Sequence, residues 1–83
     1  MEFLQRVRQF ISENFYVSDE TTLADDASLI KTGVVDSTGM LEVIAFLEGE
    51  YGISITDNEM IPENLETIGR IASFVAHKHA VVR

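Results

Sequence analysis

The sequence predicts an all-α protein, a small bundle of three main helices and one short helix with a long loop between the first two main helices. Two observations support this fold class. Apolar residues recur at helical spacing in three segments, near residues 2–14, 37–51 and 67–78, and no strand is needed to account for the rest. With 83 residues, the chain has the length of one small domain, so we expect residues 1–83 to form a single domain.

The first predicted helix spans about residues 2–14, and its apolar stripe consists of Phe3, Leu4, Val7, Phe10 and Ile11. From Phe15 to Val35 the helical periodicity fails, and polar residues and glycine become frequent. We therefore predict a long loop over residues 15–35, which is unusual in so small a domain and indicates a functional segment. Three apolar side chains are expected to pin this loop to the core: Leu23, Leu29 and Ile30.

The second predicted helix runs from about Ser37 to Tyr51. Either Asp36 or Ser37 supplies its N-cap oxygen. Gly52 ends the helix, since glycine takes the left-handed conformation at little steric cost. The apolar residues expected to face the core are Met40, Leu41, Val43, Ile44, Leu47 and Tyr51.

The remaining residues predict a short extended link, one helical turn and a final helix. Ile53 and Ile55 should face inward, Asp57 should cap a brief turn, and Pro62 limits any helix there to about one turn. Thr67 is the predicted N-cap of a last helix that ends near Lys78. Its core-facing residues are predicted to be Ile68, Ile71, Ala72 and Val75.

The charge is unevenly distributed. The formal net charge is −8, from fourteen acidic and six basic residues. Between Lys31 and Arg70 there are acidic residues but no Lys or Arg, so the excess negative charge lies in that segment. Such a surface repels nucleic acid and favours basic patches on other proteins. The alternative is a face that only keeps the protein in solution.

Several kinds of chemistry are disfavoured by the residue inventory. Cysteine is absent, which excludes a disulfide framework and a cysteine nucleophile. His77 and His79 lie two residues apart and point to different faces of a helix, so we expect no metal site. The apolar runs are too short to span a bilayer, and Glu2 is unlike the start of a signal peptide. We expect a soluble, cytoplasmic monomer that is not an enzyme.

Ser37 stands where the loop meets an acidic helix, and three interpretations are open. It can be a helix cap, or a kinase site in a small acidic regulatory or interaction domain. Alternatively, Asp36 caps the helix unaided and leaves the Ser37 hydroxyl free. A hydroxyl at that position can carry a phosphodiester, because the free N–H groups and the helix dipole attract an anion.

Residues 33–60, GVVDSTGMLEVIAFLEGEYGISITDNEM, resemble the signature of the acyl carrier protein family. That signature is a glycine-containing loop, Asp-Ser, and an acidic helix closing on Glu-Phe/Tyr-Gly-Ile-x-Ile and an acid. Here Asp36-Ser37 and residues 50–55, followed by Asp57, occupy these positions at the family's usual separation. The resemblance covers most of the chain, and it implies the acyl carrier fold with residues 1–83 as one carrier domain.

The resemblance also implies specific roles. Ser37 would carry a 4′-phosphopantetheine arm transferred from coenzyme A by a phosphopantetheinyl transferase, and the terminal thiol of the arm would hold an acyl or aminoacyl group as a thioester. Asp36 would contact the transferase and cap the helix. Basic patches on the loading ligase, and on the transferases or synthases of fatty acid or secondary-metabolite biosynthesis, would meet Glu42, Glu48 and Glu50.

Three positions depart from the pattern of fatty-acid carriers. Thr38 stands where they usually have leucine, at a position that contacts partners, and Gly49 stands where a further acid is usual. Gly39 lies in the first helical turn, where glycine costs up to about 1 kcal/mol relative to alanine. An Asp-Ser-x-Gly start resembles D-alanyl carrier proteins and stand-alone aminoacyl or peptidyl carriers more closely.

Overall fold

The computed structural model describes residues 2–17 and 23–82, and these residues form helices joined by loops. The elements are α1 (Glu2–Asn14), α2 (Ser37–Tyr51), the 3₁₀ turn η2 (Asp57–Glu59), α3 (Pro62–Leu65) and α4 (Ile68–Val82). This arrangement confirms the all-α prediction, and α1 and α2 have the predicted bounds. Ser28 and Thr67 form an isolated antiparallel β-bridge between the loop and the start of α4.

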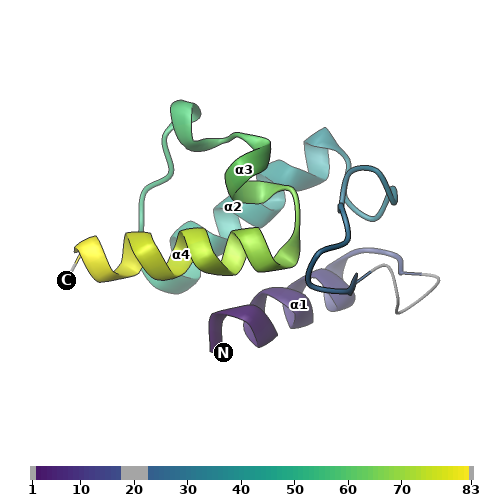
Figure 1. The fold of residues 1–83 in the computed structure, drawn as a ribbon, viewed down its shortest axis with the longest axis horizontal. Helices are drawn as coiled ribbons and strands as arrows, with labels where there is room; N and C mark the ends of the chain where they lie inside the picture. Colours follow the sequence, from purple (N-terminus) through teal and green to yellow (C-terminus); the bar gives the residue numbers. More distant parts are fainter. Residues whose placement is uncertain (1, 18–22, 83) are drawn as a thin grey trace.

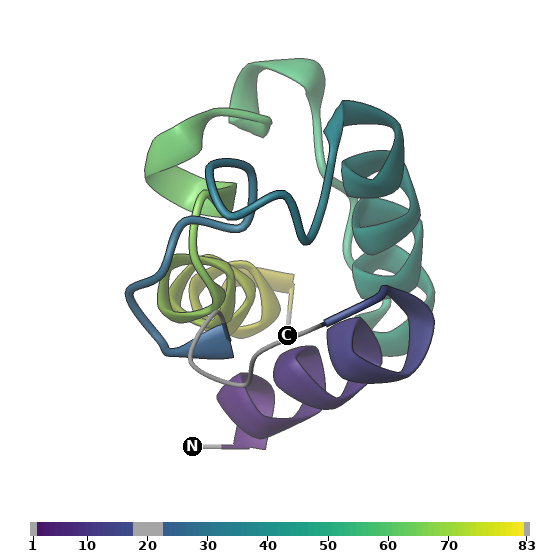
Figure 2. The ribbon, with the colours of Figure 1, turned by 90° about the vertical axis from the view of Figure 1, so that its right-hand side faces the viewer.

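The other helices are arranged around α4. In Figure 1, α4 crosses the molecule with α1 beneath it, α3 above it and α2 behind it. Figure 2 shows the loop that precedes α2 lying across one end of the bundle, between α2 and α3. Within residues 2–17 and 23–82, no helix combines the length and the apolar character that a membrane span requires.

One core joins the three long helices and the loop. The large side chains that are fully buried are Val7, Ile11, Leu29, Val35, Val43, Leu47, Ile68, Ile71 and Val75. The predicted core face of α4 is therefore correct, and Leu47 of α2 is buried in the core as predicted. Phe3, Phe10, Met40 and Tyr51 pack against this core while remaining partly exposed.

Aromatic side chains close the end of the bundle where α4 finishes. The Phe3 ring lies 5.0 Å from the Tyr51 ring and 5.6 Å from the His79 ring, centroid to centroid. These contacts hold the last turns of α4, which extends to Val82, so the prediction that it ends near Lys78 is wrong. The physical reason is that neither glycine nor proline follows Lys78, and that His79 gains ring contacts by staying helical.

The chain leaves α2 through the predicted glycine stop. Gly52 has φ 65°, and its N–H donates to the carbonyl oxygen of Glu48 at 3.0 Å. Ile53 and Ile55 then turn inward and are buried, as predicted from their alternation. The link thereby fixes the C-terminal end of α2 to the core.

The short turn η2 is capped differently from the prediction. Its N-cap is Thr56 and not Asp57, which is the first residue of the turn. The Thr56 backbone N–H donates to the Glu59 carboxylate at 2.9 Å, and Lys78 Nζ on α4 donates to the same carboxylate at 3.0 Å. The hydrogen bond from the Thr56 backbone, followed by that from Lys78, lowers the pKa of Glu59 below its ordinary value.

The loop before α2 is tied to the start of α4. Leu23 and Leu29 are buried as predicted, whereas residues 18–22 of the predicted loop lie outside the described residues. The Gly69 N–H donates to the carbonyl oxygen of Asp25 at 2.9 Å. At the predicted cap of α4, the Arg70 backbone N–H donates to Thr67 Oγ1 at 3.0 Å.

Candidate functional site

Ser37 lies at the N-terminus of α2, and its hydroxyl group does not cap the helix. Asp36 is the N-cap: its Oδ1 accepts a hydrogen bond from the Gly39 N–H at 2.6 Å, and its carbonyl oxygen accepts from the Met40 N–H at 2.8 Å. This geometry selects Asp36 over Ser37 as the capping residue. Ser37 is exposed, and its side chain hydroxyl forms no hydrogen bond with the described residues.

The approach to Ser37 is a closed turn over residues 28–35. The Val35 N–H donates to the carbonyl oxygen of Leu29 at 3.1 Å, so the chain folds back on itself just before Asp36. Gly33 lies in this turn with φ 80°, a conformation that favours glycine. Because Leu29 and Val35 are both fully buried, the turn is anchored and places the start of α2 at the surface.

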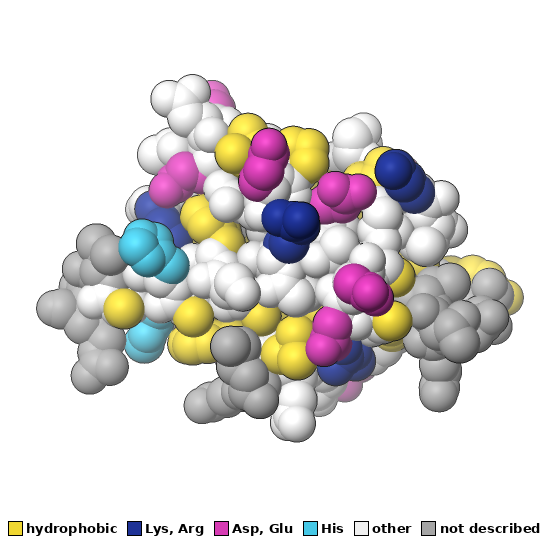
Figure 3. Space-filling model, in the orientation of Figure 1, with side chains coloured by type: hydrophobic (Ala, Val, Ile, Leu, Met, Phe, Trp, Pro, Cys, Tyr) yellow, Lys and Arg dark blue, Asp and Glu magenta, His cyan; other side chains and the backbone are white. Residues whose placement is uncertain are grey.

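An apolar groove of about 600 Å³ opens beside Ser37, between the loop, α2 and α3. We call it the Ser37 groove. Its lining residues are Ser28, Ile30, Lys31, Ser37, Met40, Leu41, Ile44, Met60, Ile61, Pro62, Leu65 and Glu66. In Figure 3, hydrophobic side chains reach the surface in the region over α3, with acidic side chains beside them.

Two side chains that the sequence predicts to be buried in the core line the Ser37 groove instead. Ile30 and Leu41 were expected to face the core, but they are 48% and 60% exposed. Both line the Ser37 groove together with Ile61, which is 41% exposed. The apolar side chains at this position therefore border an open surface hollow, and an exposed cluster of this kind is typical of a binding surface.

A second hollow of about 370 Å³ lies beside the first turn of α2 and is lined in part by Phe15, Thr38, Gly39 and Glu42. A Cβ atom added at Gly39 would meet Phe15 Cε1 at 2.7 Å and Asp36 Oδ1 at 3.1 Å. Glycine at position 39 thus lets the Phe15 ring pack on the helix start. Sequence reasoning missed the role of Phe15, and the signal for it was an otherwise unfavourable glycine in the first turn of a helix.

The acidic residues predicted to meet partners differ in their surroundings. Glu42 is exposed beside the second hollow. Glu48 is half-buried, and its Oε2 accepts a hydrogen bond from the Ile55 N–H at 2.9 Å. Glu50 Oε2 lies 3.2 Å from Arg6 Nε on α1. Glu48 and Glu50 therefore have partners within the chain.

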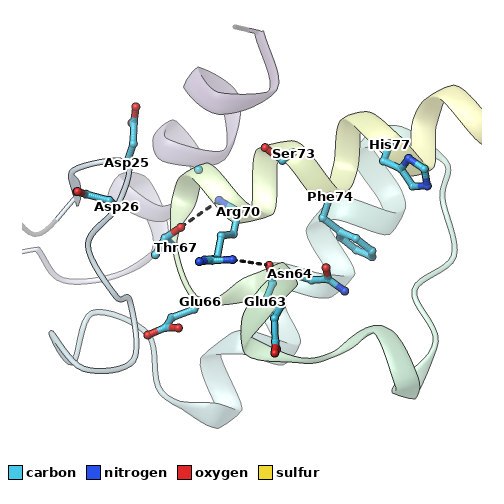
Figure 4. A pocket seen from close by; sticks show the side chains of 11 residues that line it. Asp25, Asp26, Glu63, Asn64, Glu66, Thr67, Arg70, Ser73, Phe74 and His77 are labelled. Atoms are coloured by element: carbon cyan, nitrogen blue, oxygen red, sulfur yellow. Dashed lines mark hydrogen bonds between the residues drawn. The ribbon is translucent and has the colours of Figure 1, made fainter.

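A third hollow of about 870 Å³ lies between the loop, α3 and α4, and Ser37 is not among its lining residues. Figure 4 shows the Arg70 side chain spanning it toward α3, where Arg70 Nη1 donates to the carbonyl oxygen of Glu63 at 3.3 Å. Asp25, Asp26 and His77 lie around its edge (Figure 4). The described residues contain no group of three or more His, Cys, Asp or Glu side chains that could hold a metal ion.

Comparison with known proteins identifies the class of this domain. Residues 5–75 match the family model described as a phosphopantetheine attachment site. The chain is 30% identical over 77 residues to the acyl carrier protein of Thermotoga maritima, covering 93% of this chain and 91% of that protein. It is 28% identical over 74 residues to the acyl carrier protein of Lactobacillus acidophilus, covering 89% of each.

The chain belongs to the acyl carrier protein family. It is a carrier and not an enzyme, it bears a covalently attached 4′-phosphopantetheine, and it interacts with a phosphopantetheinyl transferase and with biosynthetic enzymes. The site residues fit this group, because a free, exposed hydroxyl stands at a helix N-terminus that its neighbour already caps. When bound, the group supplies a thiol on which the acyl cargo is held as a thioester.

Proposed function

We propose that Ser37 is the attachment residue for the phosphopantetheine and that residues 1–83 form one carrier domain. The observation that carries this proposal is the division of labour at the start of α2. Asp36 satisfies the Gly39 N–H, which leaves the Ser37 hydroxyl exposed and available to a transferase. The first N–H groups of the helix and its dipole favour a phosphodiester at this place.

The attachment is tested by intact mass after incubation with coenzyme A and a broad-specificity phosphopantetheinyl transferase. The wild type should gain the mass of one phosphopantetheine. Ser37→Ala should gain none, and the matched control Ser54→Ala, at another exposed serine, should behave as the wild type. Modification of Ser37→Ala, or an unmodified wild type with several transferases, would contradict the proposal. The alternative kinase site at Ser37 predicts instead the smaller mass of a phosphate.

Two alternative classes of cargo are proposed for the thioester that this chain carries. The Asp-Ser-x-Gly start favours the D-alanyl, aminoacyl or peptidyl branch of the family, whereas the apolar lining of the Ser37 groove favours an apolar acyl chain. Loading the arm with a D-alanyl group or with an uncharged acyl chain separates them. An acyl chain that occupies the groove should shift the NMR signals of Leu41 and Ile61, and a D-alanyl group should leave them in place.

We also propose that Glu42 and Thr38 contact the transferase and later partners, together with Asp36. These side chains are exposed around the second hollow beside Ser37. Glu48 and Glu50 are proposed as weaker contacts, since each already bonds within the chain. We further propose that the carrier is a monomer and that it acts in the cytoplasm.

The docking proposal is tested by charge reversal at matched positions. Glu42→Lys should slow modification by the transferase more than Asp57→Lys, although both variants change the net charge equally and both residues are exposed. The loss should lie mainly in the association rate and shrink at high ionic strength, because salt screens electrostatic steering. Equal losses in both variants would show that only the net charge matters.

A further inference from the structure

Lys31 differs in its bonding from the other Lys and Arg residues that the structure describes. Its side chain makes no hydrogen bond or ion pair with the described residues, although it lines the Ser37 groove. The other described basic side chains are all bonded to oxygen atoms of the chain, and these are Arg6, Arg8, Arg70 and Lys78. The ammonium group of Lys31 is therefore available at the groove that also contains Ser37.

The backbone around Lys31 is held in place by the closed turn. The Lys31 N–H donates to Ser28 Oγ at 3.2 Å, and the Thr32 N–H donates to the carbonyl oxygen of Ser28 at 3.0 Å. The Gly33 N–H donates to the carbonyl oxygen of Ile30 at 3.0 Å. These bonds fix the backbone of Lys31 in the loop that lines the groove.

The chain that follows Lys31 is acidic, yet the ammonium group of Lys31 has no carboxylate partner among the described residues. No Lys or Arg follows it before Arg70, whereas the intervening segment is strongly acidic. Glu66 is the carboxylate that lines the same groove, yet it forms no ion pair with Lys31. A cation kept at the groove mouth without a partner suits an anion that arrives only after the protein is modified.

We propose that Lys31 is the counter-charge for the phosphodiester attached at Ser37. This inference rests on the proposed attachment at that serine. The helix N-terminus attracts the anion from one side, and the Lys31 ammonium attracts it from the groove side. Lys31 is thus a positioning residue: it draws the phosphodiester toward the groove and so sets the direction in which the arm leaves Ser37.

The first test compares the NMR signals of the lysine side chains in the unmodified and modified protein. The sequence has two lysines, Lys31 and Lys78, so Lys78 serves as an internal reference in its ion pair with Glu59. Modification should shift the NMR signals of the Lys31 side chain next to its ammonium group, because the phosphodiester would then lie beside it. The Lys78 signals should stay unchanged, and the Lys31 shift should shrink at high salt.

The second test compares thermal stability before and after modification. The Tm of the wild type should rise on modification. Lys31→Gln should lose part of that gain, because only the helix N-terminus still attracts the anion, and Lys31→Arg should keep the gain because the charge remains. Lys78→Gln removes an equal charge outside the groove, so it should lower both forms equally and leave the gain intact. The phosphorus NMR signal of Lys31→Arg should match the wild type, whereas that of Lys31→Gln should differ.

The outcomes distinguish this inference from the proposed attachment. If intact mass shows modification at Ser37 but the NMR signals of Lys31 do not move, the counter-charge is wrong and the attachment stands. Equal shifts at Lys31 and Lys78 would show a long-range field and would also overturn the inference. If Ser37 is never modified, both the attachment and the counter-charge fail.

Discussion

Apolar side chains are buried in the half of the molecule formed by α1 and α4, but several are exposed in the half that contains the Ser37 groove. Between α1 and α4, Val7, Ile11, Ile71 and Val75 are fully buried. Around the groove, Ile30, Leu41 and Ile61 stay substantially exposed. The first half buries its apolar side chains in the core and so contributes to stability, while the second leaves apolar surface open where a carrier meets its cargo and its partners.

α2 connects the two halves, since one side of it is core and another borders the groove. Val43 and Leu47 are fully buried, but Leu41 on the same helix is exposed. Ser37 and its capping residue Asp36 lie at the end of α2 where these two environments meet. Stability and function should therefore respond to different side chains of one helix, and the following predictions test that separation.

Truncation of two leucines in α2 should give the largest contrast. Leu47→Ala should lower the free energy of unfolding by about 2–5 kcal/mol, because it leaves a cavity in the core. Leu41→Ala removes the same atoms from the groove and should change stability by less than about 0.5 kcal/mol. Urea denaturation of both variants measures the difference, and similar losses would show that the two sides of α2 are not distinct.

Removal of the helix cap at the boundary should have the next largest effect. Asp36→Ala should cost about 0.5–2 kcal/mol of stability, because the Gly39 N–H loses its acceptor. Asp36→Asn should retain most of this stability, since an amide oxygen can also cap, while slowing the transferase through the lost charge. Asp57→Ala is the control, since Asp57 does not cap η2. An unfolding curve for Asp36→Ala that matches the wild type would refute the capping role.

The Phe15–Gly39 contact should appear as coupling between two substitutions. Gly39→Ala should destabilise the wild type, because the new methyl group meets Phe15 Cε1 and Asp36 Oδ1. In a Phe15→Ala background the same change should stabilise, since alanine favours a helix and the ring is gone. A double-mutant cycle of unfolding free energies should give a coupling of about 1 kcal/mol. Independent effects would mean that Phe15 does not hold the first turn of α2.

The smallest effect should be the pH dependence of the tether between η2 and α4. The folded-state pKa of Glu59 lies below its ordinary value of 4.5. Its stabilising contribution is therefore complete above that ordinary value and is lost as the pH falls through the lower, folded-state value. The wild-type Tm should fall more between pH 7 and pH 3 than the Tm of Lys78→Gln, which lacks the ion pair. An equal fall of Tm in both proteins would show that the Glu59–Lys78 ion pair does not contribute to stability.

Much of the fold was predictable because its signals are local. The bounds of α1 and α2, the stop at Gly52 and the cap at Thr67 follow from hydrophobic period and from the conformational preferences of single residues. The position of Ser37 before an acidic helix was equally visible. The end of α4 was not, because the contacts of His79 with Phe3 and Tyr51 come from helices distant in the sequence.

The helices, the acidic segment and the serine at its head could be predicted from the sequence, since each depends on residues close together in the chain. The packing of the helices decided which apolar residues of α2 are core, because apolar side chains occur nearly all round that helix and only its neighbours distinguish Leu47 from Leu41. It also decided that Phe15 packs on Gly39, that Glu48 is held by Ile55, and that Lys31 stands in the Ser37 groove. These contacts join residues that are separated in the sequence, so local sequence patterns do not predict them.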